Sequence, residues 1–151
     1  MKNNLVLFVS IFFVCGATVS SAQQDVLSGT AIMRDMAQPM YRVLNRMVKG
    51  ELPYDQSKAD EALTAIVALT PKIPSAFPAS NKGKVTPDRR YAASPKVWET
   101  RADFEEYAAN LSKAISDNRS KVKSLAGLKD AFKEINDACN GCHSDYRTRQ
   151  R

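Results

Sequence analysis

Four stretches of this chain carry apolar residues at three- and four-residue steps, the spacing that places them on one face of a helix. No stretch alternates apolar and polar residues for long enough to predict a strand. Amphipathic helices bury their apolar faces against one another, and short connections make neighbouring helices antiparallel. The chain of 151 residues is therefore predicted to be all-α and to fold as an up-down-up-down four-helix bundle.

Residues that start or stop helices mark the ends of the first two stretches. The first covers residues 25–49, and Gly50 and Pro53 end it. Asp55 is placed to cap the second helix, which stops at Pro71. The link between these two helices is short, so they are expected to pack as antiparallel neighbours.

The remaining helix signals are less regular. Thr100 with Asp103 resembles a capping box at the start of the third helix, and Ser124 is placed to cap the fourth. Pro39 lies inside the first helix, where it should remove one backbone hydrogen bond and bend the helix. Prolines concentrate in residues 71–99, which predicts a long crossover between the second and third helices.

The first residues have the pattern of an export signal. Lys2 precedes an apolar run over residues 5–14, and Ala22 ends a small-residue cleavage site. The run is too short to span a bilayer, so no stable membrane insertion is expected. We predict that residues 1–22 are removed after Ala22, that the protein is periplasmic, and that residues 23–151 form its single domain.

Composition excludes several classes of chemistry. A single His rules out zinc sites with several imidazoles and proton relays between two histidines. There is no Gly-rich phosphate loop and no nucleophile with an evident base, so the chain is not predicted to be an enzyme. The net charge of +6 comes from basic residues spread along the chain without a nucleic-acid motif, and no nucleic-acid partner is expected.

The strongest chemical signal is the segment Cys139-Asn140-Gly141-Cys142-His143. Two thiols three residues apart can each add to a haem vinyl group, and a His directly after the second can bind the iron, so the segment matches the c-type haem attachment pattern. Three alternatives are weaker. A zinc site lacks a fourth ligand, and a thioredoxin-like pair lacks a βαβ context. The third alternative is a plain structural disulfide between the two thiols.

Segments beyond this motif resemble one known family. Residues 142–147 (CHSDYR) are similar to the Cys-His-x-x-Tyr-Arg ending of the cytochrome c′ family and its low-spin relatives. Residues 48–55 resemble its first interhelix turn, and residues 94–98 (SPKVW) resemble its Pro-x-Ile-Trp segment. The resemblance covers essentially all of residues 23–151. One departure is Gly29, which stands where many members carry an Arg.

The resemblance implies a bundle that encloses one covalent haem c. Cys139 and Cys142 would form the thioethers, and His143 would be the proximal iron ligand. Arg147, one helical turn after His143, would lie near the proximal face; the alternative is a solvated charge in a C-terminal run with Arg149 and Arg151. Trp98 would cover the haem edge from the crossover rather than serve as a redox centre.

The opposite axial position is predicted from helix geometry. All four methionines after the signal, Met33, Met36, Met40 and Met47, lie on the first helix. If the last helix ends near Arg149, His143 is about 9 Å from that end, and an antiparallel first helix brings Met33, about 12 Å from its start, to the nearest height. The distal position of the family falls on the same residue. Met33 is therefore the predicted distal ligand, although a Met stripe also packs well in a core.

Two functions follow from the two possible iron environments. His143 and Met33 together would give a six-coordinate iron suited to one-electron transfer. A five-coordinate iron would instead leave a small apolar pocket for nitric oxide or carbon monoxide. The expected partners are redox proteins, with acidic surfaces that suit the basic chain, and a second copy of the chain in a homodimer.

Overall fold

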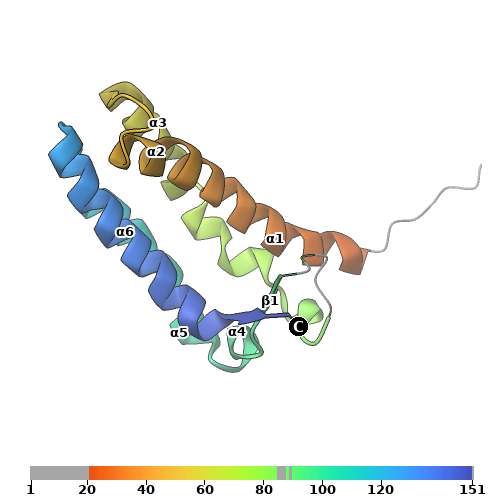
Figure 1. Cartoon of the computed structure of the whole chain (residues 1–151). Coiled ribbons are helices and arrows are strands. Elements are labelled where there is room, and N and C mark those ends of the chain that lie inside the picture. Colours follow the sequence, from red (N-terminus) through yellow and green to blue (C-terminus); the bar gives the residue numbers. More distant parts are fainter. Residues whose placement is uncertain (1–20, 85–87, 89, 151) are drawn as a thin grey trace, which may run out of the picture.

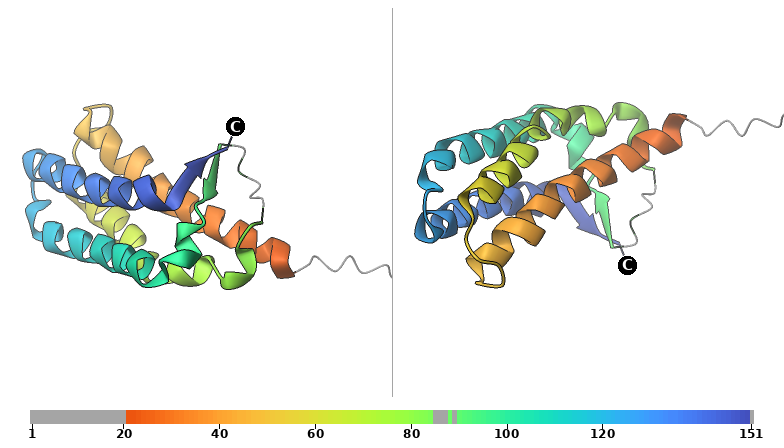
Figure 2. Two further views of the ribbon diagram at one scale, coloured as in Figure 1. Left: turned by 90° about the horizontal axis from the view of Figure 1, so that it is seen from below. Right: turned by 90° about the horizontal axis from the view of Figure 1, so that it is seen from above.

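A computed structural model describes residues 21–84, 88 and 90–150, with side chains described from residue 29 onward. The predicted signal therefore lies almost wholly outside the described residues. Four long helical segments form an up-down-up-down bundle (Figure 1), which confirms the predicted all-α architecture. Both views in Figure 2 show the start of the first helix extending beyond the crossover.

The first helical segment is interrupted at its middle. It consists of α1 (Ser21–Pro39), a π-helical turn over Met40–Leu44, and α2 (Asn45–Val48). Pro39 has no N–H, and the π turn directly after it takes up the irregularity, with the Asn45 N–H donating to the Met40 carbonyl. Gly50 ends the segment with a φ of 76°, the left-handed conformation predicted for a C-cap.

The second helix and the crossover follow. Helix α3 (Gln56–Val67) starts where predicted, because the Asp55 side chain accepts a hydrogen bond from the Lys58 N–H. The crossover is largely ordered into short elements rather than an open loop. They are the 3₁₀ turns η2 (Thr70–Lys72), η3 (Pro74–Ala76) and η4 (Ala79–Asn81), and helix α4 (Lys96–Glu99).

The third and fourth helices are α5 (Arg101–Asn118) and α6 (Leu125–Tyr146), joined by the 3₁₀ turn η5 (Arg119–Lys121). Ser124 caps α6 as predicted, since its side chain accepts from the Gly127 N–H. The predicted capping box at Thr100 is wrong. Its hydroxyl instead donates to the Lys96 carbonyl and pairs with the Tyr146 hydroxyl at 3.0 Å.

Two short strands form a ribbon that the sequence did not predict. Strand β1 (Tyr91–Ala93) pairs antiparallel with β2 (Arg147–Arg149), and Tyr91 lies opposite Arg149. Three-residue strands are too short to show a period of two, so only their tertiary pairing reveals them. The ribbon also ends α6 at Tyr146, three residues before the predicted end near Arg149.

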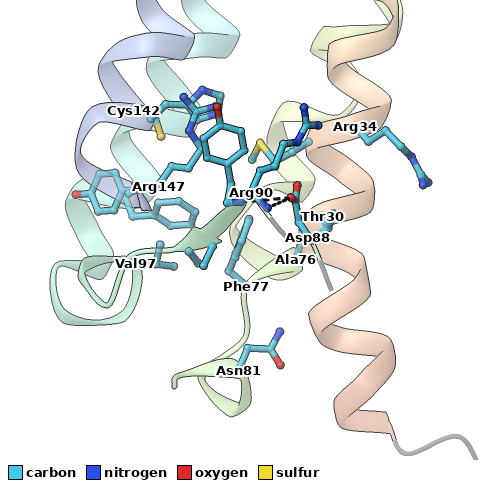
Figure 3. Close-up of a pocket in the computed structure, with 18 of the residues that line it drawn as sticks. Thr30, Arg34, Ala76, Phe77, Asn81, Asp88, Arg90, Val97, Cys142 and Arg147 are labelled. Atoms are coloured by element: carbon cyan, nitrogen blue, oxygen red, sulfur yellow. Dashed lines mark hydrogen bonds between the residues drawn. The ribbon is translucent and has the colours of Figure 1, made fainter. Parts of the chain in front are cut away.

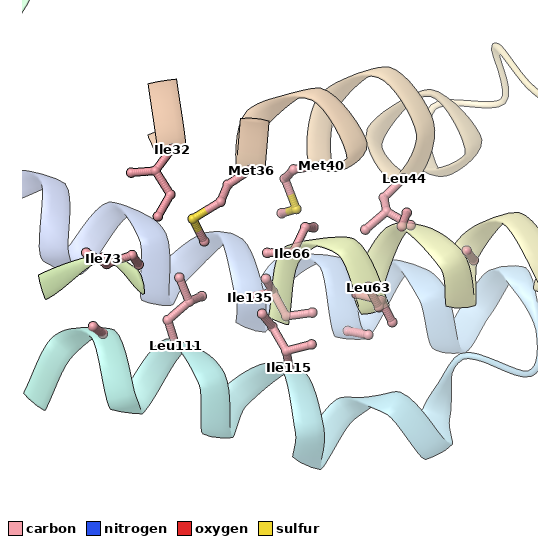
Figure 4. Close-up of a cluster of buried hydrophobic side chains, with 14 of the residues drawn as sticks. Ile32, Met36, Met40, Leu44, Leu63, Ile66, Ile73, Leu111, Ile115 and Ile135 are labelled. Atoms are coloured by element: carbon pink, nitrogen blue, oxygen red, sulfur yellow. The ribbon is translucent and has the colours of Figure 1, made fainter. Parts of the chain in front are cut away.

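The core is densest at one end of the bundle. Leu44, Leu63 and Ile135 are all 0% exposed there, and their side chains converge from three helices (Figure 4). Helix α2 contacts α6 at this end, whereas α1 packs on α3 and on the turns η3 and η4. Figure 1 shows α1 and α6 diverging toward the ribbon.

Candidate functional site

A cavity of about 490 Å³ lies between α1, the crossover and the end of α6. Its volume is within the range of pockets that hold cofactors and drug-sized ligands. Residues of the first helical segment, the crossover and the end of α6 line it, among them Gly29, Met33, Arg34, Tyr41, Phe77, Asn81, Lys84, Asp88, Arg90, Tyr91, Val97, Trp98, Cys142, His143, Tyr146 and Arg147. Figure 3 shows the cavity with the ribbon and the crossover at its lower edge.

The last two turns of α6 supply the thiols. Cys142 lines the cavity, and Cys139, half-buried one turn earlier, packs against the core beside it. Both thiols are free. Burial raises the pKa of each to about 11, so both are protonated at neutral pH. Two thiols one helical turn apart suit covalent attachment of a haem, whereas no group of three or more His, Cys, Asp or Glu side chains that could hold a metal ion occurs among the described residues.

His143 lies next to Cys142 and lines the same cavity. Burial, followed by the positive charge of Arg147, lowers the pKa of its imidazole to about 4. The ring is therefore neutral at pH 7, which is the form that binds a metal ion.

The four methionines separate into one cavity residue and three core residues. Met36, Met40 and Met47 are 7%, 4% and 1% exposed within the core, and Figure 4 shows Met36 and Met40 directed into it. Met33 is half-buried and lines the cavity, as Cys142 and His143 do. Of these four residues, the structure brings Met33 alone to the cavity.

The packing of Phe77 against α1 explains why position 29 is a glycine. A Cβ at this position would lie 2.8 Å from Cε1 of Phe77 and 3.2 Å from the Ala76 carbonyl oxygen. The missing side chain lets the Phe77 ring pack against α1, and the ring meets Phe104 edge-on at 5.6 Å. This wall of the cavity is therefore aromatic where the resemblance would have placed a charged residue.

Tyr41 is a cavity residue that the sequence analysis missed. It lies in the π turn, lines the cavity, and its hydroxyl donates to Asn136 on α6 at 3.2 Å. Burial and then the nearby Cys139 raise the pKa of Tyr41. Its phenol therefore connects the two diverging helices beside the thiols, and Pro39, two residues earlier, was the available signal.

Trp98 and Arg147 both line the cavity. Trp98 is half-buried, and its indole N–H donates to the Pro78 carbonyl at 2.9 Å, which fixes the ring at the crossover. Arg147 was expected to continue the helix. It instead begins β2, with φ −122° and ψ 131°. Its guanidinium lies 4.3 Å from the centre of the Tyr91 ring, while its charge still acts on His143.

The residues together fit a haem. Paired neutral thiols and a neutral imidazole come from one helix, a thioether faces the cavity from another, and aromatic side chains line the walls. The thiols can hold the macrocycle covalently, and the imidazole and thioether are both common axial ligands of haem iron. Among the described residues, no helix is long and apolar enough to span a membrane.

Comparison with known proteins agrees with this assignment. The family model described as Cytochrome C′ matches residues 26–147. The chain is 37% identical to cytochrome c-555 of Bradyrhizobium diazoefficiens over 97% of both chains, and 37% identical to cytochrome c-556 of Rhodopseudomonas palustris over 91% of this chain and 92% of that one. The solved structure of oxidised R. palustris cytochrome c556 is 35% identical, has a TM-score of 0.75, and is matched over 85% of this chain and 99% of its own.

Proposed function

The chain belongs to the cytochrome c′ family, and we propose that it transfers single electrons through a haem c whose iron is held between His143 and Met33. Members of this family are haem proteins without enzymatic activity, and they bind one covalent haem c through the Cys-x-x-Cys-His motif, here Cys139, Cys142 and His143. The haem supplies a one-electron couple at its iron.

The observation that carries the proposal is the position of Met33. It lines the cavity that Cys142 and His143 line from the other side, while the other three methionines are committed to the core. A thioether opposite the imidazole would fill both axial positions. An iron with two permanent ligands changes little on reduction, and the thioether raises its potential.

Aromatic residues that line the cavity support this role. Phe77 and Trp98 close the crossover side, and Tyr41 lies beside the thiols. Hydrogen bonds at 2.9 Å and 3.2 Å fix Trp98 and Tyr41 to neighbouring elements. Side chains held in place around the haem favour electron transfer at the haem edge over exchange of ligands at the iron.

Absorption spectra of the ferric and ferrous holoprotein, with and without carbon monoxide, test the proposal. We expect the wild type to be low-spin and slow to bind carbon monoxide, and Met33→Ala to be high-spin and to bind it readily. Met36→Ala is the matched control, because it truncates a methionine of the same helix that faces the core. A wild type that is already high-spin and binds carbon monoxide would overturn Met33 ligation and favour gas binding.

We also propose that the protein works in the periplasm after cleavage following Ala22. Members of the family are typically periplasmic, and the pattern of residues 1–22 supports export. The mass of the mature protein tests the cleavage site, since a chain beginning at Gln23 is expected.

The proposed partners are redox proteins with acidic surfaces. Lys84 lines the cavity and Arg149 ends β2 beside it, and these exposed cations would attract such a surface. Electron-transfer rates with an acidic partner should then fall as salt is added. A homodimer remains part of the proposal, and sedimentation of the holoprotein would measure it.

A further inference from the structure

We propose that the β1–β2 ribbon is the carboxylate-binding edge of the haem site, where Arg90 and Arg147 pair with the two propionate groups of the haem. The inference rests on the family's haem, and it is independent of Met33 ligation. It assigns a function to Arg90, and it explains what the β1–β2 ribbon contributes to the haem site.

Charge is distributed unevenly around the cavity. The walls formed by Met33, Phe77 and Val97 are apolar, whereas the ribbon end carries the guanidinium groups of Arg90 and Arg147. Arg34 also borders the cavity, but its Nε lies 3.5 Å from Asp35 Oδ1, and the side chain extends away from the other residues in Figure 3. The cationic end of the cavity is therefore the ribbon end.

Asp88, a carboxylate that lines the same cavity, accepts hydrogen bonds from the backbone. Its Oδ1 accepts from the Arg90 N–H at 2.8 Å and from the Tyr91 N–H at 3.3 Å, and these bonds hold the start of β1. Within residues 29–84, 88 and 90–150, no ion pair joins a carboxylate to the guanidinium of Arg90 or Arg147. Both side chains can therefore accept an anionic partner.

Tyr91 organises the two cations. Arg147 lies opposite Ala93 in the ribbon, which puts it diagonal to Tyr91, and its guanidinium stacks over that ring at 4.3 Å. The Arg90 guanidinium is 6.0 Å from the same ring. Stacking occupies the flat face of a guanidinium and leaves its N–H edge free, and that edge matches a carboxylate in two parallel hydrogen bonds.

Covalent geometry brings the ribbon to the haem. Arg147 follows His143 by four residues, and the backbone bond from the Ser94 N–H to the Tyr146 carbonyl ties the crossover to the end of α6. A haem held by Cys139 and Cys142 has two carboxylates that would be costly to bury against Met33 or Phe77 without partners. The ribbon end is where their charge is compensated.

Reduction potentials of the holoprotein test the assignment. Arg90→Gln should shift the equilibrium with a redox mediator at least threefold toward the oxidised form, because it removes a positive charge beside the carboxylates. Arg34→Gln is the matched control: it removes the same charge at the cavity rim from a side chain that points to solvent, and it should shift the equilibrium much less. Arg90→Lys should restore most of the wild-type potential.

A second readout reports on the propionates themselves. The propionate bending band in resonance Raman spectra should move in Arg90→Gln and stay in place in Arg34→Gln. Equal shifts of potential in these two variants, with an unchanged band, would overturn the proposal. So would an Arg90→Gln protein that differs only in the salt dependence of its reaction with an acidic partner, because Arg90 would then serve the partner. Failure of Met33 ligation is separate, since it changes the spin state of the wild type.

Discussion

The two ends of the bundle use the same helices for different purposes. At the packed end, Leu44, Leu63 and Ile135 are fully buried and every helix contributes apolar side chains. At the cavity end, Met33, Cys142 and His143 are only half-buried in the protein alone. Helix α6 contributes to both ends, with Leu128 and Ile135 in the core and the haem motif beginning one turn after Ile135, at Cys139.

The divergence of α1 from α6 separates the two ends. The turns η3 and η4 contact α1 near the cavity, whereas α2 meets α6 at the other end. Stability should therefore depend mainly on the packed end, and the spectrum and potential of the haem on the cavity end. Variants at matched positions test whether the two ends act separately.

The largest loss of stability is expected from Leu63→Ala. Leu63 is 0% exposed, and truncating such a residue typically lowers the free energy of unfolding by about 2–5 kcal/mol. Denaturant unfolding of the holoprotein measures it, and the half-buried Val67 of the same helix provides the control variant Val67→Ala, which should cost less. The folded protein should keep its absorption spectrum, and a change of spin state would show that the two ends are coupled.

Gly127→Ala should cost about 1–3 kcal/mol, because the new Cβ would lie 1.9 Å from the Lys121 carbonyl oxygen. The backbone of η5 would have to move away from the start of α6. Gly141→Ala in the same helix is the control, since its Cβ would be 3.8 Å from Tyr107 and Ala favours a helix. Equal stabilities of the two variants, measured by thermal unfolding, would contradict this explanation.

Gly29→Ala tests the cavity end with a smaller effect on stability, about 1 kcal/mol. Its Cβ would press on the Phe77 ring, which must move into the cavity or away from Phe104. We expect a shifted haem potential as well as the loss of stability. A double-mutant cycle with Phe77→Leu checks the cause, because the cost of Gly29→Ala should shrink when the ring is absent. Additive effects would remove Phe77 from the explanation.

Tyr41→Phe should have the smallest effect, about 0.5 kcal/mol of unfolding free energy, because it removes one exposed hydrogen bond to Asn136. The variant is informative because this hydrogen bond joins the two diverging helices beside Cys139. Asn136→Ala should have a similar effect, and the double variant should add nothing further. Additive losses would show that the two side chains act independently.

Local signals predicted most of the helix boundaries. Asp55, Ser124 and Gly50 act within a few residues of themselves, so their caps could be read directly from the sequence. Thr100 failed as a cap because a distant partner, the Tyr146 hydroxyl, engages its side chain. Arg147 lies outside α6 because of another distant contact: β1 pairs with the residues that follow Tyr146. Both errors come from contacts that a local pattern cannot contain.

The candidate site divides in the same way. Cys139, Cys142 and His143 are separated by a fixed number of residues along the chain. The sequence alone therefore predicts that they share one helix face. Phe77 and Arg90 came to the cavity through the crossover, whose path depends on Gly29 and on the ribbon. No local feature of the sequence marks either residue as part of the site.

The four helices, the covalent haem motif and the family resemblance could all be predicted from the chain alone, because periodicity, caps and fixed spacing are properties of neighbouring residues. Helix geometry and the resemblance already selected Met33 among the four methionines, but the packing of Met36 in the core and the gathering of the cations depend on the tertiary structure. All four methionines lie on one helix, and only the divergence of α1 from α6 leaves Met33 at the cavity while Met36 packs in the core. The ribbon likewise needs two segments far apart in the chain, so its guanidinium groups become neighbours only on folding.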